Sequence, residues 1–312
     1  MEHQLRAFAG EADLPAMAAL AKAFPTTNLH VADLPYRFSS WALDYPDNIA
    51  VWIDGDGALL GWAIMQTPFW TIDYACHPTA AAALHPQILA WADARARQIA
   101  GTPSGRPMWF VNVFSGQHDR IHDLELAGFA SQADVGEDSW TKVLMRRPGQ
   151  LSIPPSPLPE GFTLRPLGGE DEVEAYVALH QAAFQSKNMT VPWRQRTLSR
   201  PEYTAGLDLV AIAPSGRLAA FCIGWLNRPP SGANSGPITG QIEPLGVHED
   251  FQHQGLGRCL LFEVLRRHQQ HGAEWVDVET DNYRDAAFAL YSSVGFQVLE
   301  DVLVYRKDYG DR

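Results

Sequence analysis

The chain has 312 residues, which predicts two domains, and its 46% hydrophobic and 19% charged residues exclude a largely disordered protein. Its 36 Asp and Glu against 24 Lys and Arg give a net charge of −12, so we expect no nucleic-acid partner. The three cysteines are too far apart for a disulfide framework or a zinc motif. With neither a signal peptide nor an apolar run of about 18 residues, we expect a cytoplasmic protein without a membrane partner.

The two halves of the chain repeat one order of elements. LRAFAGE at 5–11 recurs as LRPLGGE at 164–170, and the hairpin VWIDGDGALLGWAI at 51–64 recurs as VAIAPSGRLAAFCI at 210–223. Both recurrences have an offset of 159 residues, which indicates a duplicated domain. Each half reads as strand, helix, second helix, hairpin, strand, long helix, strand, helix and strand, which predicts an α/β fold with a mixed, partly parallel sheet.

A proline-rich segment separates the halves. Five prolines fall between Pro148 and Pro159, a density that excludes helix or inner strand and predicts a stiff linker. We therefore expect a first domain at 1–147, a linker at 148–160 and a second domain at 161–312. We also expect a monomer with pseudo-dimeric halves or a weak homodimer.

The most informative stretch of the second half is a glycine loop between a strand and a helix. A strand at 242–247 leads into Gln252, Gly255 and Gly257, followed by a long helix from Leu256 to about residue 271. Glycines before a helix start let backbone amides approach a phosphate, and Arg258 adds a guanidinium beside them. The same glycines would also suit a tight turn that needs a positive φ. Both interpretations stay open at this stage.

Two motifs in the second half resemble the GCN5-related N-acetyltransferases. Gln252-x-x-Gly255-x-Gly257, after a strand that ends Leu245-Gly246-Val247, resembles the acyl-CoA signature of that family. ALYSSVGF at 289–296 resembles its closing motif. Because the first half repeats the plan, the chain resembles the tandem members of the family, similar to the mycothiol synthases.

The resemblance implies acetyl-CoA as co-substrate, with the loop amides on its pyrophosphate and the strand on its pantetheine arm. The implied cofactor-binding residues are Leu245, Gly246, Val247, Gln252, His253, Gln254, Gly255, Leu256, Gly257, Arg258, Asn282 and Tyr291. The family's asparagine, seven residues before the tyrosine, is replaced here by Arg284. Asn282 therefore either reaches the pantetheine from a longer loop or only caps the following helix.

The resemblance also implies roles for two catalytic residues. Tyr291 matches the tyrosine that protonates the leaving thiolate, although a structural role is the alternative. Glu243 is the candidate base for an amine whose pKa is about 10.4, or else it recognises a cationic substrate or pairs with a neighbouring strand. The predicted function is acetyl transfer to the amine of a small molecule by direct attack in a ternary complex. The alternative is a non-catalytic acyl-CoA-binding module or sensor.

The first half keeps the scaffold and loses the site. At an offset of 171, Ala81, Leu84 and Pro86 replace Gln252, Gly255 and Gly257. A proline removes a backbone donor where several are needed. At the same offset the position of Glu243 becomes Ile72, and the alignment of AGF at 127–129 with VGF at 294–296 places Leu124 at the position of Tyr291. We expect a degenerate domain without an acyl-CoA site.

Other candidates in the second half have simpler interpretations. His268 and His271, next to two arginines, are expected on a solvated helix face, and we expect no metal site. Cys259 is expected to be a small core residue. Trp193 with Arg194, and Glu202 with Tyr203, lie in a helical region where they either contact the acceptor or pack in the core.

Overall fold

The computed structural model describes residues 3–133, 141–229, 236–281 and 285–310. The chain forms two compact units. Unit 1 comprises Met1–Val143, Asp281–Tyr283 and Glu300–Arg312, and unit 2 comprises Leu144–Thr280 and Arg284–Leu299. The protein has the mixed α/β fold that the sequence predicts. Among the described residues no helix is long and apolar enough to cross a membrane.

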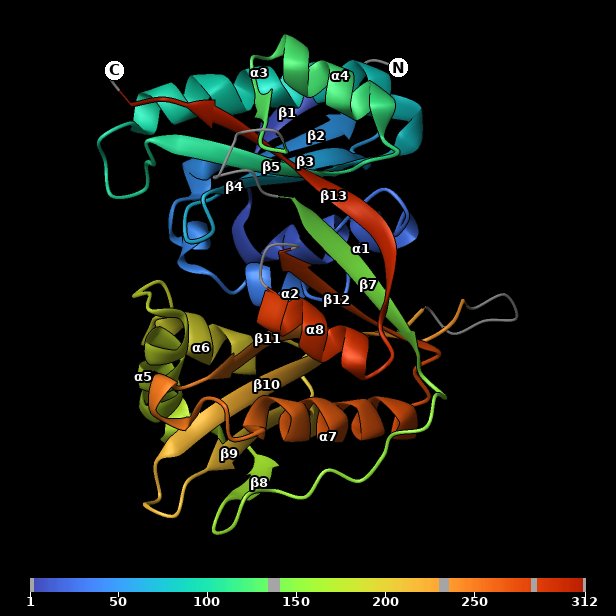
Figure 1. The fold of residues 1–312 in the computed structure, drawn as a ribbon. Coiled ribbons are helices and arrows are strands. Elements are labelled where there is room, and N and C mark those ends of the chain that lie inside the picture. Colours follow the sequence, from blue (N-terminus) through green and yellow to red (C-terminus); the bar gives the residue numbers. More distant parts are fainter. Residues whose placement is uncertain (1–2, 134–140, 230–235, 282–284, 311–312) are drawn as a thin grey trace. The chain divides into compact units, whose positions relative to one another are not determined.

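Unit 1 is a sheet with helices on both faces. Its elements are β1 (His3–Ala7), α1 (Leu14–Ala23), α2 (Leu34–Arg37), β2 (Ile49–Asp54), β3 (Leu59–Gln66), β4 (Thr71–Cys76), α3 (Ala81–Ile99), β5 (Met108–Phe114), α4 (His118–Leu126) and β6 (Ala130–Ser131). Neighbouring strands in β1-β2-β3-β4 are antiparallel, and β4 and β5 are parallel. Alternate residues of β3 pack on α1 and on α3, which lie on opposite faces of the sheet (Figure 1).

Unit 2 repeats this plan. Its elements are β7 (Lys142–Pro148), β8 (Thr163–Pro166), α5 (Val173–Phe184), α6 (Val191–Leu198), β9 (Asp208–Ile212), β10 (Leu218–Asn227), β11 (Thr239–Val247), α7 (Leu256–Gln270), β12 (Trp275–Asp281) and α8 (Asp285–Ser293). The last strand, β13 (Gln297–Asp308), begins in unit 2 and continues in unit 1. Strands β8 to β11 are antiparallel neighbours, β11 and β12 are parallel, and α5 and α7 both pack on β10. The long helix was predicted from Leu256 to about residue 271, and α7 agrees with this prediction to within one residue.

The internal repeat is visible in local detail. Arg6 pairs with Asp13 at 2.8 Å in unit 1, and Arg165 pairs with Glu172 in the same way at the start of unit 2. The hairpin glycines Gly57 and Gly216, 159 residues apart, share a φ of 84°. A duplicated sequence has therefore kept the turns that define the domain.

The end of the chain belongs to unit 1. Residues 302–308 of β13 pair with β5 in antiparallel register, from Val302 opposite Phe114 to Asp308 opposite Met108. Val302, Val304 and Tyr305 are buried there. Conversely, residues 144–148 of β7 belong to unit 2, where Arg146 pairs with Asp277 of β12 at 2.7 Å. The domain boundaries at 147 and 161 stay a prediction. The sequence did not predict that residues 144–148 belong to unit 2 or that residues 300–308 belong to unit 1.

The proline-rich linker lies along α7 of unit 2 (Figure 1). Gln269 donates to the carbonyl of Leu151 at 2.8 Å, and Cys259 Sγ lies 3.4 Å from the carbonyl of Pro157. Cys259 is buried at 5% exposure, as predicted for a core residue. The linker therefore has fixed contacts with the helix instead of crossing open solvent.

The expectation for His268 is wrong. Its side chain is fully buried on α7, with Nε2 3.1 Å from the carbonyl of Trp225. A Cβ atom at Gly224 or Gly240 would lie 2.5 or 2.4 Å from the ring, so these two glycines provide the space that the imidazole fills. The residues that indicate burial of His268 are these glycines on the neighbouring strands. The arginines next to His268 on the helix wrongly suggested a solvated face.

This burial predicts acid sensitivity of unit 2. Burial lowers the pKa of His268 from 6.5 to about 4. Because the folded state holds His268 neutral, the stabilisation is complete above the unfolded pKa of 6.5 and is lost as the pH falls towards 4. The free energy of unfolding is measured by urea denaturation at about pH 7 and at about pH 5. On this change of pH, it should fall by about 2 kcal/mol more in wild type than in His268→Asn.

Candidate functional site

The site is built around the end of strand β11. β11 pairs with β12 only from Thr239 to Gln241, and among the described residues the strands separate beyond that point. Towards β10 the register shifts between Ile242 and Leu245, where the Glu243–Pro244 peptide bond is cis. Pro244 has no amide hydrogen to donate to a neighbour. The end of β11 thus presents a free edge on its β12 side.

Two backbone amides point out of this free edge. The amide of His248 donates to the carbonyl of Ala219 on β10 at 2.9 Å, so residue 248 faces β10. Amides alternate in direction along an antiparallel strand, and therefore Gly246 also faces β10 while Leu245 and Val247 face away from it. The amides of Leu245 and Val247 are available to a ligand that lies along the edge.

The loop after β11 leads to an open helix start. The His248 side chain accepts from the amide of Asp250 at 3.1 Å, and residues 252–255 are exposed. His253 and Gly255 have φ values of 60° and 84°, and Gly255 caps α7 without any side-chain hydrogen bond. The first helical amide bonded to this turn is that of Cys259, which donates to Gly255. The amides of residues 256–258 therefore have no carbonyl partner within the helix, and they can donate to an anion.

The two glycines of the loop have different roles. A Cβ atom on Gly255 would meet nothing within 4 Å, so glycine is needed there for its left-handed φ and not for space. A Cβ atom on Gly257 would lie 3.5 Å from Val247 and 3.8 Å from Leu245 and from Leu290. The start of α7 is therefore close to the free edge of β11 and to α8. Arg258 reaches across to α8 and donates to Ser293 Oγ at 3.1 Å.

Tyr291 and Glu243 are electrostatically coupled. Tyr291 on α8 is 7% exposed, and burial raises its pKa above 10.0, with further increases from Cys222 and Glu243. Tyr291 therefore keeps its proton at neutral pH. Glu243 is half-buried on β11, and its carbonyl accepts from the indole of Trp225 at 2.6 Å. The two predicted catalytic residues thus share one region of unit 2.

The predicted residues divide into three groups. The β11 residues, the 252–258 loop and Tyr291 gather around the end of β11, as the contacts above describe. Asn282 and Arg284 lie outside the described residues. Arg194 and Tyr203 instead join a buried cluster, where Arg194 forms an ion pair with Asp208 and Tyr203 donates to Asp208 at 2.7 Å. Cys222 lies on β10 and pairs with Leu245 of β11. No sequence motif indicated that Cys222 lies at this site.

The corresponding region of unit 1 is built differently. His85 aligns with Leu256 at the offset of 171, yet α3 already begins at Ala81, four residues before that position. The stretch that aligns with the exposed loop 252–255 is therefore helical in unit 1. Ile72 and Leu124, at the positions of Glu243 and Tyr291, are 2% and 0% exposed in the hydrophobic core.

Residues 172–296 match the family model described as acetyltransferase (GNAT) family. Over these residues, about two fifths of its length, the chain is similar to this family. The match lies within the span of unit 2, contains β11, the glycine loop and Tyr291, and ends at the last residue of the closing motif.

The sequence relatives of this chain include mycothiol acetyltransferases. The mycothiol acetyltransferase of Salinispora arenicola is 31% identical over 157 residues, 49% of this chain and 50% of that protein. The mycothiol acetyltransferase of Thermobispora bispora is 30% identical over 166 residues, 52% of this chain and 56% of that protein. The chain thus matches about half the length of these relatives.

Two solved structures resemble the whole chain. A GCN5-related N-acetyltransferase from Sphaerobacter thermophilus has a TM-score of 0.63 at 19% identity, over 99% of this chain and 96% of that one. A tandem GNAT protein from the clavulanic acid biosynthesis pathway has a TM-score of 0.63 at 14% identity, over all of both chains. At such identities the likeness concerns the fold, which is that of two GNAT units in tandem.

Proposed function

We propose that unit 2 transfers the acetyl group of acetyl-CoA to the amine of a small molecule by direct attack in a ternary complex. The observation that carries the proposal is the free edge of β11, with two outward amides beside the open start of α7. The mycothiol acetyltransferases among the relatives support acetyl transfer to a small molecule. The amine acceptor and a cytoplasmic site of action are parts of the same proposal.

The residues around the end of β11 fit acetyl-CoA. The amides of Leu245 and Val247 would bind the pantetheine arm along the strand edge. The amides of residues 252–258 and the guanidinium of Arg258 would bind the pyrophosphate, because an open helix start and a cation both favour anions. When bound, acetyl-CoA supplies the acetyl group as a thioester. An outward amide of β11 would also donate to the carbonyl oxygen of that thioester.

Glu243 and Tyr291 would handle the protons. At neutral pH an amine of pKa about 10.4 is protonated, and Glu243, directly or through a water, would accept the proton that must leave. The pKa of Tyr291 lies above the usual thiol value of about 8.5, so its hydroxyl first acts on the leaving sulfur as a hydrogen-bond donor. Once Glu243 is protonated, its charge no longer raises the pKa of Tyr291, which favours transfer of the phenolic proton.

The experiment that tests this function measures free thiol. The full chain is mixed with acetyl-CoA and a panel of primary amines, and the products are identified by mass spectrometry. Amine-dependent thiol release with an N-acetylated product supports the transferase. Saturable acetyl-CoA binding without thiol release for any amine supports instead the non-catalytic binding module.

Substitution of Gly255 tests where acetyl-CoA binds. Gly255→Ala should lower the affinity for acetyl-CoA by about tenfold or more, since the change of φ moves loop amides that would bind a charged group. Gly216→Ala is a matched control, with the same φ of 84° and nothing within 4 Å of an added Cβ. Both variants should lose about 1–2 kcal/mol of stability, and only Gly255→Ala should lose affinity in calorimetry. Equal affinities in the two variants would place the pyrophosphate elsewhere.

A further inference from the structure

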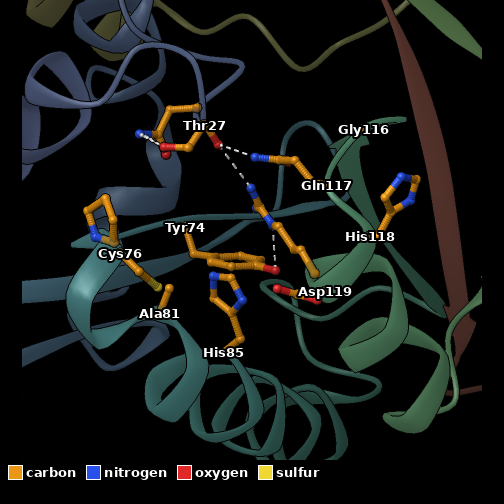
Figure 2. Close-up of a pocket in the computed structure, with 12 residues that line it drawn as sticks. Thr27, Tyr74, Cys76, Ala81, His85, Gly116, Gln117, His118 and Asp119 are labelled. Carbon is orange, nitrogen blue, oxygen red and sulfur yellow. Dashed lines mark hydrogen bonds between the residues drawn. The ribbon is translucent and has the colours of Figure 1, made fainter.

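Unit 1 contains a cavity at the place that corresponds to the proposed acyl-CoA cleft of unit 2. β4 pairs with β5 only at Thr71 and Phe110, so among the described residues these parallel strands also separate. A cavity of about 360 Å³ lies beside the separated part of β4, bounded by the starts of α3 and α4 and by residues 27–28 after α1 (Figure 2). This volume is within the range of small-molecule sites, about 300–1,000 Å³.

Arg120 on α4 is the single Lys or Arg among the residues that line this cavity. Its Nε donates to the hydroxyl of Tyr74 at 2.7 Å, its Nη1 reaches the carbonyl of Thr27 at 3.4 Å, and its guanidinium lies 3.9 Å from the Tyr74 ring. Within the described residues Arg120 forms no ion pair, and its Nη2 has no hydrogen-bond partner. In a chain with a net charge of −12, this arginine is available to an anion from outside.

The other side chains add neutral polar and apolar groups. The His85 ring packs edge-on against Tyr74, with centroids 5.8 Å apart, and burial followed by Arg120 lowers its pKa to about 4, so it is neutral (Figure 2). Ala81 and Cys76 form an apolar wall. Asp119 is the single acid among the lining residues, and it is exposed.

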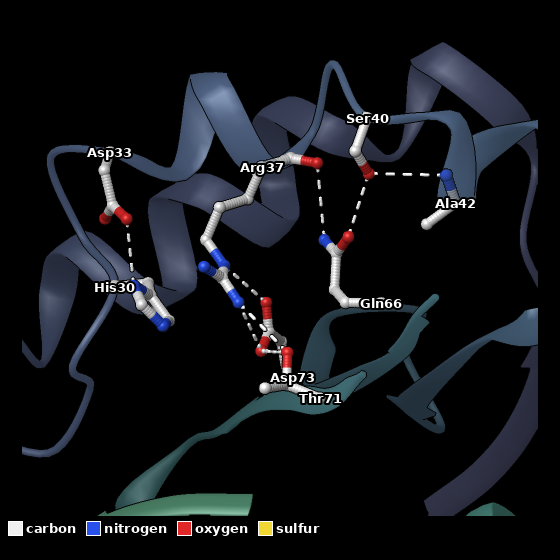
Figure 3. Close-up of polar contacts among 8 residues, drawn as sticks. All are labelled: His30, Asp33, Arg37, Ser40, Ala42, Gln66, Thr71 and Asp73. Atoms are coloured by element: carbon white, nitrogen blue, oxygen red, sulfur yellow. Dashed lines mark hydrogen bonds and ion pairs between the residues drawn. The ribbon is translucent and has the colours of Figure 1, made fainter. Parts of the chain in front are cut away.

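A second, smaller cavity continues from the first. It has a volume of about 30 Å³, shares Asn28, Tyr74 and Arg120 with the larger cavity, and reaches His30. His30 Nδ1 lies 2.9 Å from Asp33, whereas its Nε2 is buried without a hydrogen-bond partner among the described residues (Figure 3). A buried ring nitrogen of this kind needs a partner, and the cavity has room for a water or one polar ligand group.

The composition of the cavity excludes a nucleotide-type ligand. The stretch that aligns with the phosphate loop of unit 2 is helical in unit 1, and Pro86 lacks the amide that Gly257 has. The single guanidinium of Arg120 can neutralise one negative charge. It therefore suits a carboxylate better than a pyrophosphate, which has several charges. The apolar wall and the Tyr74 ring suit the carbon part of such a ligand.

We propose that unit 1 binds a small organic monocarboxylate in this cavity. The carboxylate pairs with Arg120, and the carbon part lies against Tyr74 and the apolar wall near Ala81. Unit 1 is then a second ligand site of the chain, distinct in chemistry from the acetyl-CoA site proposed for unit 2.

The test uses ligand-observed NMR on the full chain with three acids and their amides as probes. Benzoate, 4-hydroxyphenylacetate and hexanoate are each compared with the matched primary amide, which has nearly the same shape and no charge. At least one acid should bind about tenfold or more tightly than its amide. Arg120→Met should abolish that preference, whereas Arg97→Met, an exposed arginine of α3 outside the cavity, should keep it.

A second variant addresses the cavity itself. Ala81→Phe should abolish binding of acid and amide alike, because the larger side chain fills the cavity. Both variants should keep their binding of acetyl-CoA, which separates this site from the one in unit 2. The proposal is overturned if none of the three acids is preferred over its amide, or if Arg120→Met and wild type bind the acids equally.

Discussion

Glu243→Gln is expected to lower kcat/KM for acetyl transfer to an alkyl amine by about 10²–10⁴. Glutamine keeps the shape of the side chain on β11 but accepts no proton at neutral pH. An amine of pKa about 10.4 then reaches the reactive neutral form only at a cost of about 4.6 kcal/mol at pH 7. The measurement is the steady-state rate of thiol release in wild type and variant.

The acceptor's own pKa separates the two roles considered for Glu243. An amine that is already neutral at pH 7, such as an aryl amine or a hydrazide, needs no base, so Glu243→Gln should affect its rate far less. If Glu243 only recognises a cation, the variant should instead raise KM for alkyl amines and leave kcat unchanged. That outcome would contradict the role as base.

Tyr291→Phe serves as the companion variant. It removes the phenolic proton and keeps the ring, which packs against Phe296 with centroids 5.7 Å apart. We expect a loss of about 10² in kcat, at the lower end for general acids because a thiolate leaves readily. The affinity for acetyl-CoA should stay within a few-fold of wild type, and the loss should not depend on the pKa of the amine.

Truncation after Leu299 is expected to unfold unit 1. The deletion removes the part of β13 that pairs with β5, including the buried Val302, Val304 and Tyr305. Loss of three buried side chains at about 1.5–3 kcal/mol each approaches the whole stability of a typical domain, about 5–15 kcal/mol. It also leaves β5 with an unpaired edge. Thermal unfolding and limited proteolysis should show rapid cleavage within residues 3–133.

The control for this truncation ends the chain after Gly310, which keeps β13 complete. It should unfold at the same temperature as the full chain. If the chain that ends at Leu299 also unfolded at that temperature, the C-terminal strand would not be part of the cooperative structure of unit 1.

Much of the fold could be predicted because local patterns determine it. The hairpins at Gly57 and Gly216 and the long helix from Leu256 depend on residues close together in the sequence. The repeat was found by comparing such local patterns between the two halves. The pairing of β13 with β5 was missed because an alternating strand pattern does not identify its partner. His268 was misplaced for a related reason, since Gly224 and Gly240 make its space from other strands.

The residues of the candidate site that belong to a sequence motif could be predicted. The loop residues and Tyr291 came from two short patterns, and the structure brings them to one end of β11. The cavity of unit 1 was not predicted, because the sequence comparison considered the residues that were lost, such as Glu243 replaced by Ile72. The orientation of Arg120 towards Tyr74 depends on packing between α4 and β4, which no local pattern indicates.

The stoichiometry of acetyl-CoA binding tests the central claim most directly. The claim is that acyl-CoA chemistry belongs to unit 2 alone, because the exposed loop 252–255 has a helical counterpart in unit 1. Isothermal titration of acetyl-CoA into the full chain should give one molecule bound per chain, with binding greatly weakened by Gly255→Ala. Two molecules per chain, or one molecule whose affinity is the same in Gly255→Ala, would contradict the account.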